Sequence, residues 1–152
     1  MTTGVFALWF IGVAFFVLVL LFAGIALLST LFARAGGWAR LAERYGADQK
    51  PEGQKLTWQT LEVGGLVRYR WTVVVVISPR GLYLALSSPF IIKHPPMLIP
   101  WTEIKEARRA ILFWRRAARL TIGDPQVSTI AMWMSLFEAI RPYLPPGAAK
   151  DV

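Results

Sequence analysis

The chain has 152 residues, 55% of them hydrophobic, and its 17 Lys and Arg outnumber its 9 Asp and Glu, for a formal net charge of +8. The absence of cysteine excludes disulfides, thiolate nucleophiles and Cys metal sites. The positive charge favours anionic partners, such as lipid headgroups, nucleic acid or acidic proteins.

The first predicted element is an apolar helix over residues 4–33, which contain no charged side chain. Such a helix is roughly 45 Å long, against a hydrocarbon core of about 30 Å, and a tilt absorbs the excess. A cleaved signal peptide is the alternative, because Ala33-Arg34-Ala35 has the spacing that a signal peptidase accepts. The run is about twice too long for a signal peptide and no basic residue precedes it, so we predict a retained transmembrane anchor over residues 1–35.

All the Lys and Arg follow this helix, which predicts its orientation. Lys and Arg remain on the cytoplasmic side of a membrane, so we expect the N-terminus outside and the remaining chain in the cytoplasm, anchored in a bacterial inner membrane. The predicted membrane-interface residues are Trp9, Trp38, Arg34 and Arg40. For Trp38, packing within the domain is an equally open interpretation.

Residues 36–54 are predicted to form a short amphipathic helix and a linker. Glycines at positions 36 and 37 end the membrane helix, and apolar residues then recur at helical spacing over 38–45. This helix either lies on the membrane surface or caps the domain.

Residues 55–144 are predicted to form one mainly-β domain. A strand over 56–63 precedes a hairpin of strands 67–77 and 82–86, joined by a turn at 78–81. Alternation in the first hairpin strand puts Val67, Tyr69 and Trp71 on one face, and Arg68, Arg70 and Thr72 on the other.

The second half of the domain carries weaker patterns. A short strand is predicted at 90–93, and residues 97–99 lead into the segment at 100–104. Residues 104–122 fit either a helix or two strands around a turn near Ala110, and we favour the strands. A strand at 127–131, a final amphipathic helix shortened by Pro142, and a loose tail over 145–152 complete the chain.

The predicted fold class is therefore one N-terminal transmembrane helix followed by a mainly-β domain of about seven short strands and a C-terminal helix. One helix cannot cover both faces of such a sheet. A bent sheet or partly open barrel, plugged by the helix, solves this problem.

Two short motifs, Gly-Leu-Tyr-Leu at 81–84 and Ile-Pro-Trp-Thr-Glu-Ile at 99–104, accompany this order of elements. Together they resemble the pleckstrin-homology-like (PH-like and GRAM-like) domains, and the bacterial membrane-anchored versions in particular. The resemblance covers about residues 55–144. It implies a PH-like fold and a binding role, without naming a lipid.

A basic stretch over residues 105–119 is interrupted by an apolar centre at 111–114. Its candidate residues for binding lipid headgroups or a partner are Lys105, Arg108, Arg109, Arg115, Arg116 and Arg119. On a membrane, the cations would meet anionic headgroups while the apolar centre enters the interface. The plainer alternative, slightly favoured, is a solvated charged edge of a hairpin whose Ile111 and Trp114 are core.

No catalytic or metal-binding motif is found in the sequence. The single histidine, His94, precedes two prolines and is expected to be a surface loop residue, and Glu103 and Glu106 lie among cations, which favours ion pairing. We predict a non-enzymatic protein without cofactor, metal or small-molecule substrate.

Two functions are consistent with these predictions. In the first, the cytoplasmic domain binds the anionic inner leaflet or a neighbouring membrane protein, as an accessory or scaffold. In the second, it is an adaptor that binds a partner peptide through its sheet edge. Nucleic acid is a weaker third partner, because the chain is anchored to a membrane.

Overall fold

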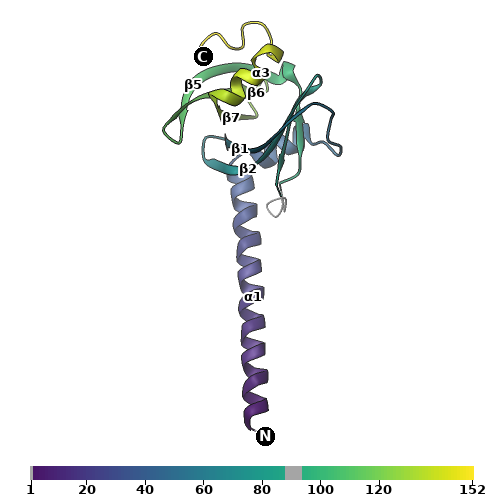
Figure 1. Ribbon diagram of the computed structural model, residues 1–152, viewed down its shortest axis with the longest axis vertical. Coiled ribbons are helices and arrows are strands. Elements are labelled where there is room, and N and C mark those ends of the chain that lie inside the picture. Colours follow the sequence, from purple (N-terminus) through teal and green to yellow (C-terminus); the bar gives the residue numbers. More distant parts are fainter. Residues whose placement is uncertain (1, 88–93) are drawn as a thin grey trace.

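A computed structural model describes residues 2–87 and 94–152, and shows one long helix that carries a small β domain (Figure 1). The predicted strand at 90–93 lies outside the described residues. The helices are α1 (Thr2–Ala35), α2 (Trp38–Tyr45) and α3 (Met134–Ile140), with 3-10 turns at Trp101–Glu103 and Arg141–Tyr143. The strands are β1 (Gln54–Val63), β2 (Val67–Ser78), β3 (Gly81–Leu86), β4 (Met97–Ile99), β5 (Ile104–Leu112), β6 (Arg115–Ile122) and β7 (Ser128–Trp133).

Helix α1 projects away from the domain (Figure 1). Its segment Gly4–Leu31 has 28 residues and a mean hydropathy of 3.0 over its most apolar window, none of which is buried. Because so much uncovered apolar surface is unfavourable in water, this helix has the length and composition of a membrane span or a signal sequence.

The described strands form one antiparallel sheet in the order β4-β3-β2-β1-β7-β6-β5, which curls into a half-barrel. The predicted hairpin is confirmed, since Ser78 pairs with Gly81 at the β2–β3 turn. Residues 104–122 are two strands, as predicted, paired from Ile104↔Ile122 to Leu112↔Arg115. The fold class predicted from the sequence, an apolar helix followed by a bent seven-stranded sheet and a short C-terminal helix, is confirmed.

Two helices pack on the inner face of the curled sheet: α3, as expected, and α2, for which the membrane surface was the other alternative. Leu136, Phe137 and Ile140 of α3 are buried there, and so are Trp38 and Leu41 of α2. The amphipathic helix after α1 therefore caps the domain. Only residues 36 and 37 separate α1 from α2, so the domain begins directly at the end of the long helix.

The last residues of the chain lie along the free edge of β5. The backbone N–H of Ala107 donates to the Ala148 carbonyl (2.6 Å), and that of Arg109 to the Asp151 carbonyl (3.2 Å). An edge strand presents unpaired N–H groups, and the tail satisfies some of them. This arrangement differs from the loose tail that the composition of residues 145–152 predicts.

Candidate functional site

The β5–β6 hairpin ends in a turn made by two aromatic residues. Phe113 and Trp114 have φ angles of 49° and 64°, which are the two positive values that a type I′ hairpin turn requires. The predicted turn near Ala110 is therefore wrong by about three residues. Asn-Gly is the usual sequence signal for such a turn. Phe and Trp are not typical turn residues, so the sequence does not indicate a turn at this position.

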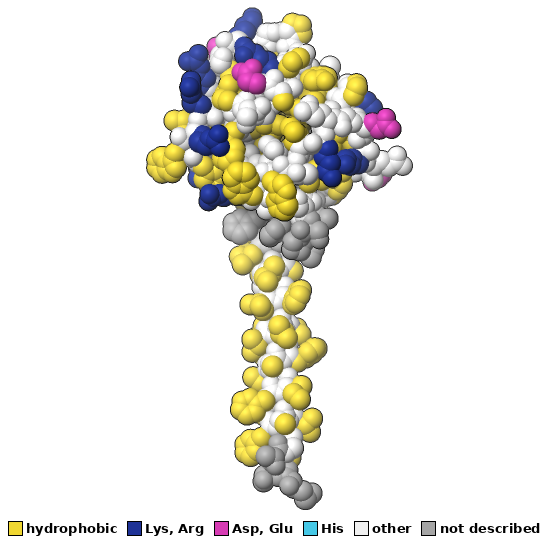
Figure 2. Space-filling model, viewed as in Figure 1, with side chains coloured by type: hydrophobic (Ala, Val, Ile, Leu, Met, Phe, Trp, Pro, Cys, Tyr) yellow, Lys and Arg dark blue, Asp and Glu magenta, His cyan; other side chains and the backbone are white. Residues whose placement is uncertain are grey.

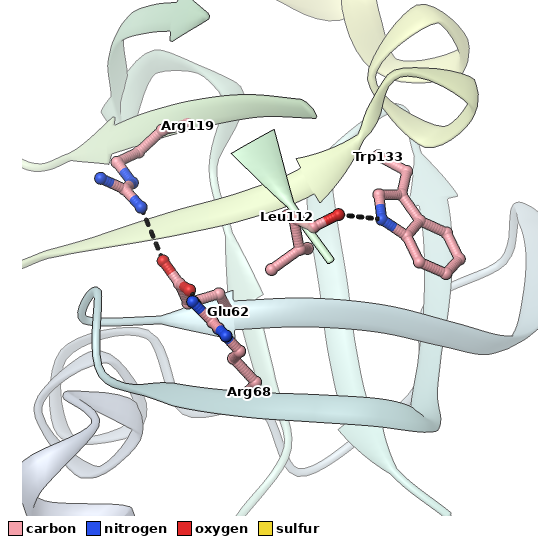
Figure 3. Close-up of polar contacts among 5 residues, drawn as sticks. All are labelled: Glu62, Arg68, Leu112, Arg119 and Trp133. Atoms are coloured by element: carbon pink, nitrogen blue, oxygen red, sulfur yellow. Dashed lines mark hydrogen bonds and ion pairs between the residues drawn. The ribbon is translucent and has the colours of Figure 1, made fainter. Parts of the chain in front are cut away.

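The end of this hairpin packs against the outer face of the sheet. The indole Nε1 of Trp133, at the end of β7, donates to the Leu112 carbonyl over 3.0 Å (Figure 3). The guanidinium groups of Arg68 and Arg70, on β2, lie 5.3 and 5.4 Å from the Phe113 ring centroid. These contacts hold the hairpin end beside the first residues of β2.

A buried carboxylate ties three strands together beneath the hairpin. Glu62 on β1 is 3% exposed, and its two oxygens accept hydrogen bonds from Arg68 (2.8 Å) and Arg119 (2.6 Å), as Figure 3 shows. A buried charge is tolerated when it is paired and hydrogen-bonded. Arg119, predicted to bind a headgroup or partner, is thus engaged within the domain.

The apolar side chains at the hairpin end are exposed. Trp114 is 98% exposed and Ile111 is 71% exposed, so the favoured expectation that both are core residues is wrong. Only Leu112 of the apolar centre is fully buried. The next strand, β7, pairs with β6 only from Ala117 to Ile122, so its pairing does not reach Ile111 and Trp114.

Arg115 and Arg116 stand beside Trp114. The Arg115 guanidinium lies 4.4 Å from the Trp133 ring centroid, and Trp133 contacts Trp71 edge to face at 5.5 Å. We call Trp71, Trp114, Arg115, Arg116 and Trp133 the tryptophan–arginine surface. In the described part of the chain, none of its arginines forms an ion pair.

The other predicted cations lie further along the hairpin. Lys105 donates to the Thr102 carbonyl over 2.9 Å. Arg108 pairs with Glu106 over 2.8 Å, and the hydrogen bond that it donates to this carboxylate raises the pKa of Arg108. Arg109 is exposed. The structure therefore brings only Arg115 and Arg116 together with exposed aromatic side chains.

Trp71 was expected on the same face of β2 as Val67 and Tyr69, and this expectation is wrong. Its φ of 58° and the register irregularities between β1 and β2 interrupt the alternation, which leaves the side chain about half exposed. A β-bulge turns a side chain toward the other face in this way. Arg68 and Arg70 lie outward, as predicted.

Two further expectations need correction near the start of the domain. Trp38, one of the predicted interface anchors, is fully buried, and its Nε1 donates to the Pro95 carbonyl over 3.0 Å. His94 is 5% exposed, and its Nε2 lies 3.1 Å from the Tyr69 hydroxyl. Burial raises the pKa of Tyr69, so that its hydroxyl stays protonated. Trp38 and His94 are core residues because α2 packs against this end of the sheet.

The start of β2, whose Arg68 contacts the hairpin end, follows a turn that lies against the residue after α1. A Cβ atom at Gly64, in the β1–β2 turn, would collide with the carbonyl of Gly36, which directly follows α1. Arg68, next along β2, contacts the hairpin end. Figure 2 shows hydrophobic and basic side chains side by side on the part of the domain nearest the long helix. Trp9, Arg34 and Arg40 are exposed on the helical segments.

Sequence reasoning missed Trp71 and Trp133 as parts of this surface, and it missed the buried Glu62. One signal was available, since Arg directly adjoins Trp at positions 70–71 and 114–115. No group of three His, Asp or Glu side chains suited to a metal occurs among residues 2–87 and 94–152. A scan of the chain against protein-family models finds no match, and a search of curated proteins finds none.

Proposed function

We propose that this chain is a non-enzymatic single-pass membrane protein of a bacterial inner membrane, whose cytoplasmic PH-like domain binds the anionic inner leaflet. In this proposal α1 is retained as the anchor, and the domain acts as an accessory or scaffold at the membrane surface. The order of seven strands followed by a helix supports the resemblance to PH-like domains.

One observation carries the proposal. The hairpin leaves Trp114 and Ile111 uncovered beside Arg115 and Arg116, in a domain joined to an apolar helix by only two residues. Tryptophan favours the interface between lipid and water. Each Lys or Arg near an anionic surface contributes about 1 kcal/mol of attraction.

The direct attachment of the domain strengthens this weak attraction. An anchor converts binding of the domain to the membrane into an intramolecular event, with an effective concentration in the millimolar range. A few cations and one tryptophan are then sufficient to hold the domain against the leaflet. The distribution of charge supports the cytoplasmic side, because all 17 Lys and Arg follow the uncharged stretch of residues 4–33.

The alternative of a partner peptide at the sheet edge is less favoured. Both described edges are partly covered by the chain itself, β5 by residues 148–151 and β4 by Gly46 and Ala47. A peptide would have to displace these segments before it could add a strand.

The proposal is tested with the full chain, labelled with 5-fluorotryptophan and inserted in lipid nanodiscs. The seven tryptophans give separate 19F resonances, assigned by single Trp→Tyr variants. In anionic nanodiscs with spin-labelled headgroups, we expect strong broadening of the Trp114 resonance, weakened by added salt. The buried Trp101 serves as the control. A Trp114 resonance as sharp as that of Trp101 would exclude the leaflet as the partner and favour a neighbouring protein.

A further inference from the structure

The tryptophan–arginine surface contains a pocket of about 530 Å³ where the hairpin meets the junction of β7 and α3. Its lining residues are Trp114, Arg115, Arg116, Trp133, Met134 and Ser135. Two of these carry a positive charge and none carries a negative one. The pocket is therefore complementary to an anion that also presents apolar groups.

The Arg115 side chain is held in place before any ligand binds. Its guanidinium stacks 4.4 Å from the Trp133 ring centroid, and Trp133 is fixed in turn by its hydrogen bond to the Leu112 carbonyl. Stacking uses the face of a guanidinium and leaves the N–H groups at its edge available. These N–H groups match the oxygens of a phosphate group.

Glu62, the buried acidic residue that pairs with Arg119 of β6, does not neutralise the pocket. Both oxygens of Glu62 are occupied by Arg68 and Arg119. Arg115 and Arg116 form no ion pair within the part of the chain that the structure describes, so both can attract an external anion.

We propose that this pocket is a binding site for the phosphate of one lipid headgroup. Arg115 and Arg116 donate hydrogen bonds to the phosphate oxygens, and Trp114 lies along the glycerol and upper acyl chains. The exposure of Trp114, at 98%, favours a lipid over free phosphate, because free phosphate offers nothing for this side chain to contact. This inference rests on the proposed binding to the inner leaflet.

The test uses the same 5-fluorotryptophan protein in nanodiscs of phosphatidylcholine, titrated with dihexanoyl phosphatidic acid. We expect the Trp133 resonance to shift and to saturate, as occupation of a single site requires. Inorganic phosphate is titrated in parallel and should leave this resonance in place over the same concentration range. An equal response to inorganic phosphate would overturn the assignment to a lipid.

Three variants that each remove one positive charge distinguish binding at a specific site from general electrostatic attraction. Arg115→Gln and Arg116→Gln remove pocket residues, whereas Arg109→Gln removes an exposed cation of the same hairpin that does not line the pocket. We expect the apparent Kd to rise about 10-fold for either pocket variant, and less than about 2-fold for Arg109→Gln. Arg116→Gln leaves the contact between Arg115 and Trp133 intact, and an unshifted Trp101 resonance verifies that each variant is folded.

The outcomes distinguish this inference from the proposed function. Equal weakening in all three variants, with Trp114 still broadened in anionic nanodiscs, would overturn the phosphate site and leave binding to the leaflet standing. A Trp133 resonance that does not shift would have the same meaning. If the Trp114 resonance of the unmodified protein is not broadened in anionic nanodiscs with spin-labelled headgroups, both proposals are overturned.

Discussion

Glu62 joins three strands through its two arginine partners. Its side chain is 4% exposed, while those of Arg68 and Arg119 are 53% and 44% exposed. The arginines can therefore turn to water if the carboxylate is lost, but the buried group at position 62 cannot. The contribution of this network to stability lies mainly in the hydrogen bonds that satisfy the buried oxygens.

Replacing this carboxylate should destabilise the domain. For Glu62→Gln we expect the free energy of unfolding to fall by about 2 kcal/mol, because a neutral amide cannot accept two charged donors and buries an NH₂ facing an arginine. Glu138→Gln is the matched control, since its pair with Arg141 is exposed and 3.3 Å long, and it should cost less than about 0.5 kcal/mol. Urea unfolding of the full chain in detergent micelles measures both values. Similar losses for the two variants would contradict a structural role for Glu62.

Trp114 adopts a left-handed backbone that bulky side chains disfavour, yet it makes little contact with the domain. For Trp114→Gly we expect the free energy of unfolding to stay unchanged or to rise by up to about 1 kcal/mol. At the same time, spin-labelled headgroups should broaden the Trp71 and Trp133 resonances less. Trp114→Tyr should retain the broadening, since tyrosine also favours the interface. A marked loss of stability in Trp114→Gly would show that this residue serves packing instead.

At the scale of elements, the hairpins and helices follow from local patterns, but the end of the β5–β6 hairpin does not. Two strands are readable from the alternation in residues 116–122, whereas the position of the turn depends on contacts with Trp133 and Arg68. These contacts join residues that are distant in the sequence. No window of the sequence around Ala110 contains them.

The junction between α1 and the domain is the element that sets the orientation of the domain. Gly64 and Gly65 both have positive φ angles, of 69° and 76°, but only a Cβ at Gly64 would meet another atom, the Gly36 carbonyl. We expect Gly65→Ala to lower the free energy of unfolding by about 1 kcal/mol, because alanine disfavours this backbone conformation. Gly64→Ala should lower it clearly more, because the junction must also open. Thermal unfolding of the full chain in micelles compares them. Equal losses of stability in the two variants would mean that the junction opens without a measurable cost in free energy.

For the whole molecule, the central question is on which side of the membrane the domain lies. Because the chain has no cysteine, a single Cys at position 3 or at the exposed Gln126 is a unique label. In intact cells treated with a membrane-impermeant maleimide, we expect Thr3→Cys to react from outside and Gln126→Cys to react only after lysis. Labelling of Gln126→Cys from outside, on a shortened chain, would mean that α1 is a cleaved signal sequence.

The sequence by itself determined the features that depend on local periodicity and on composition. The uncharged stretch of residues 4–33, the placement of every cation after it, the β2–β3 hairpin and the short final helix are all readable in this way. Only the tertiary structure decided which aromatic residues are core and which are exposed. Trp38 is buried because α2 docks on the sheet, whereas Trp114 is exposed because its hairpin extends past that sheet. Burial depends on what the rest of the chain brings to a residue, and a periodic pattern in one segment does not contain that information.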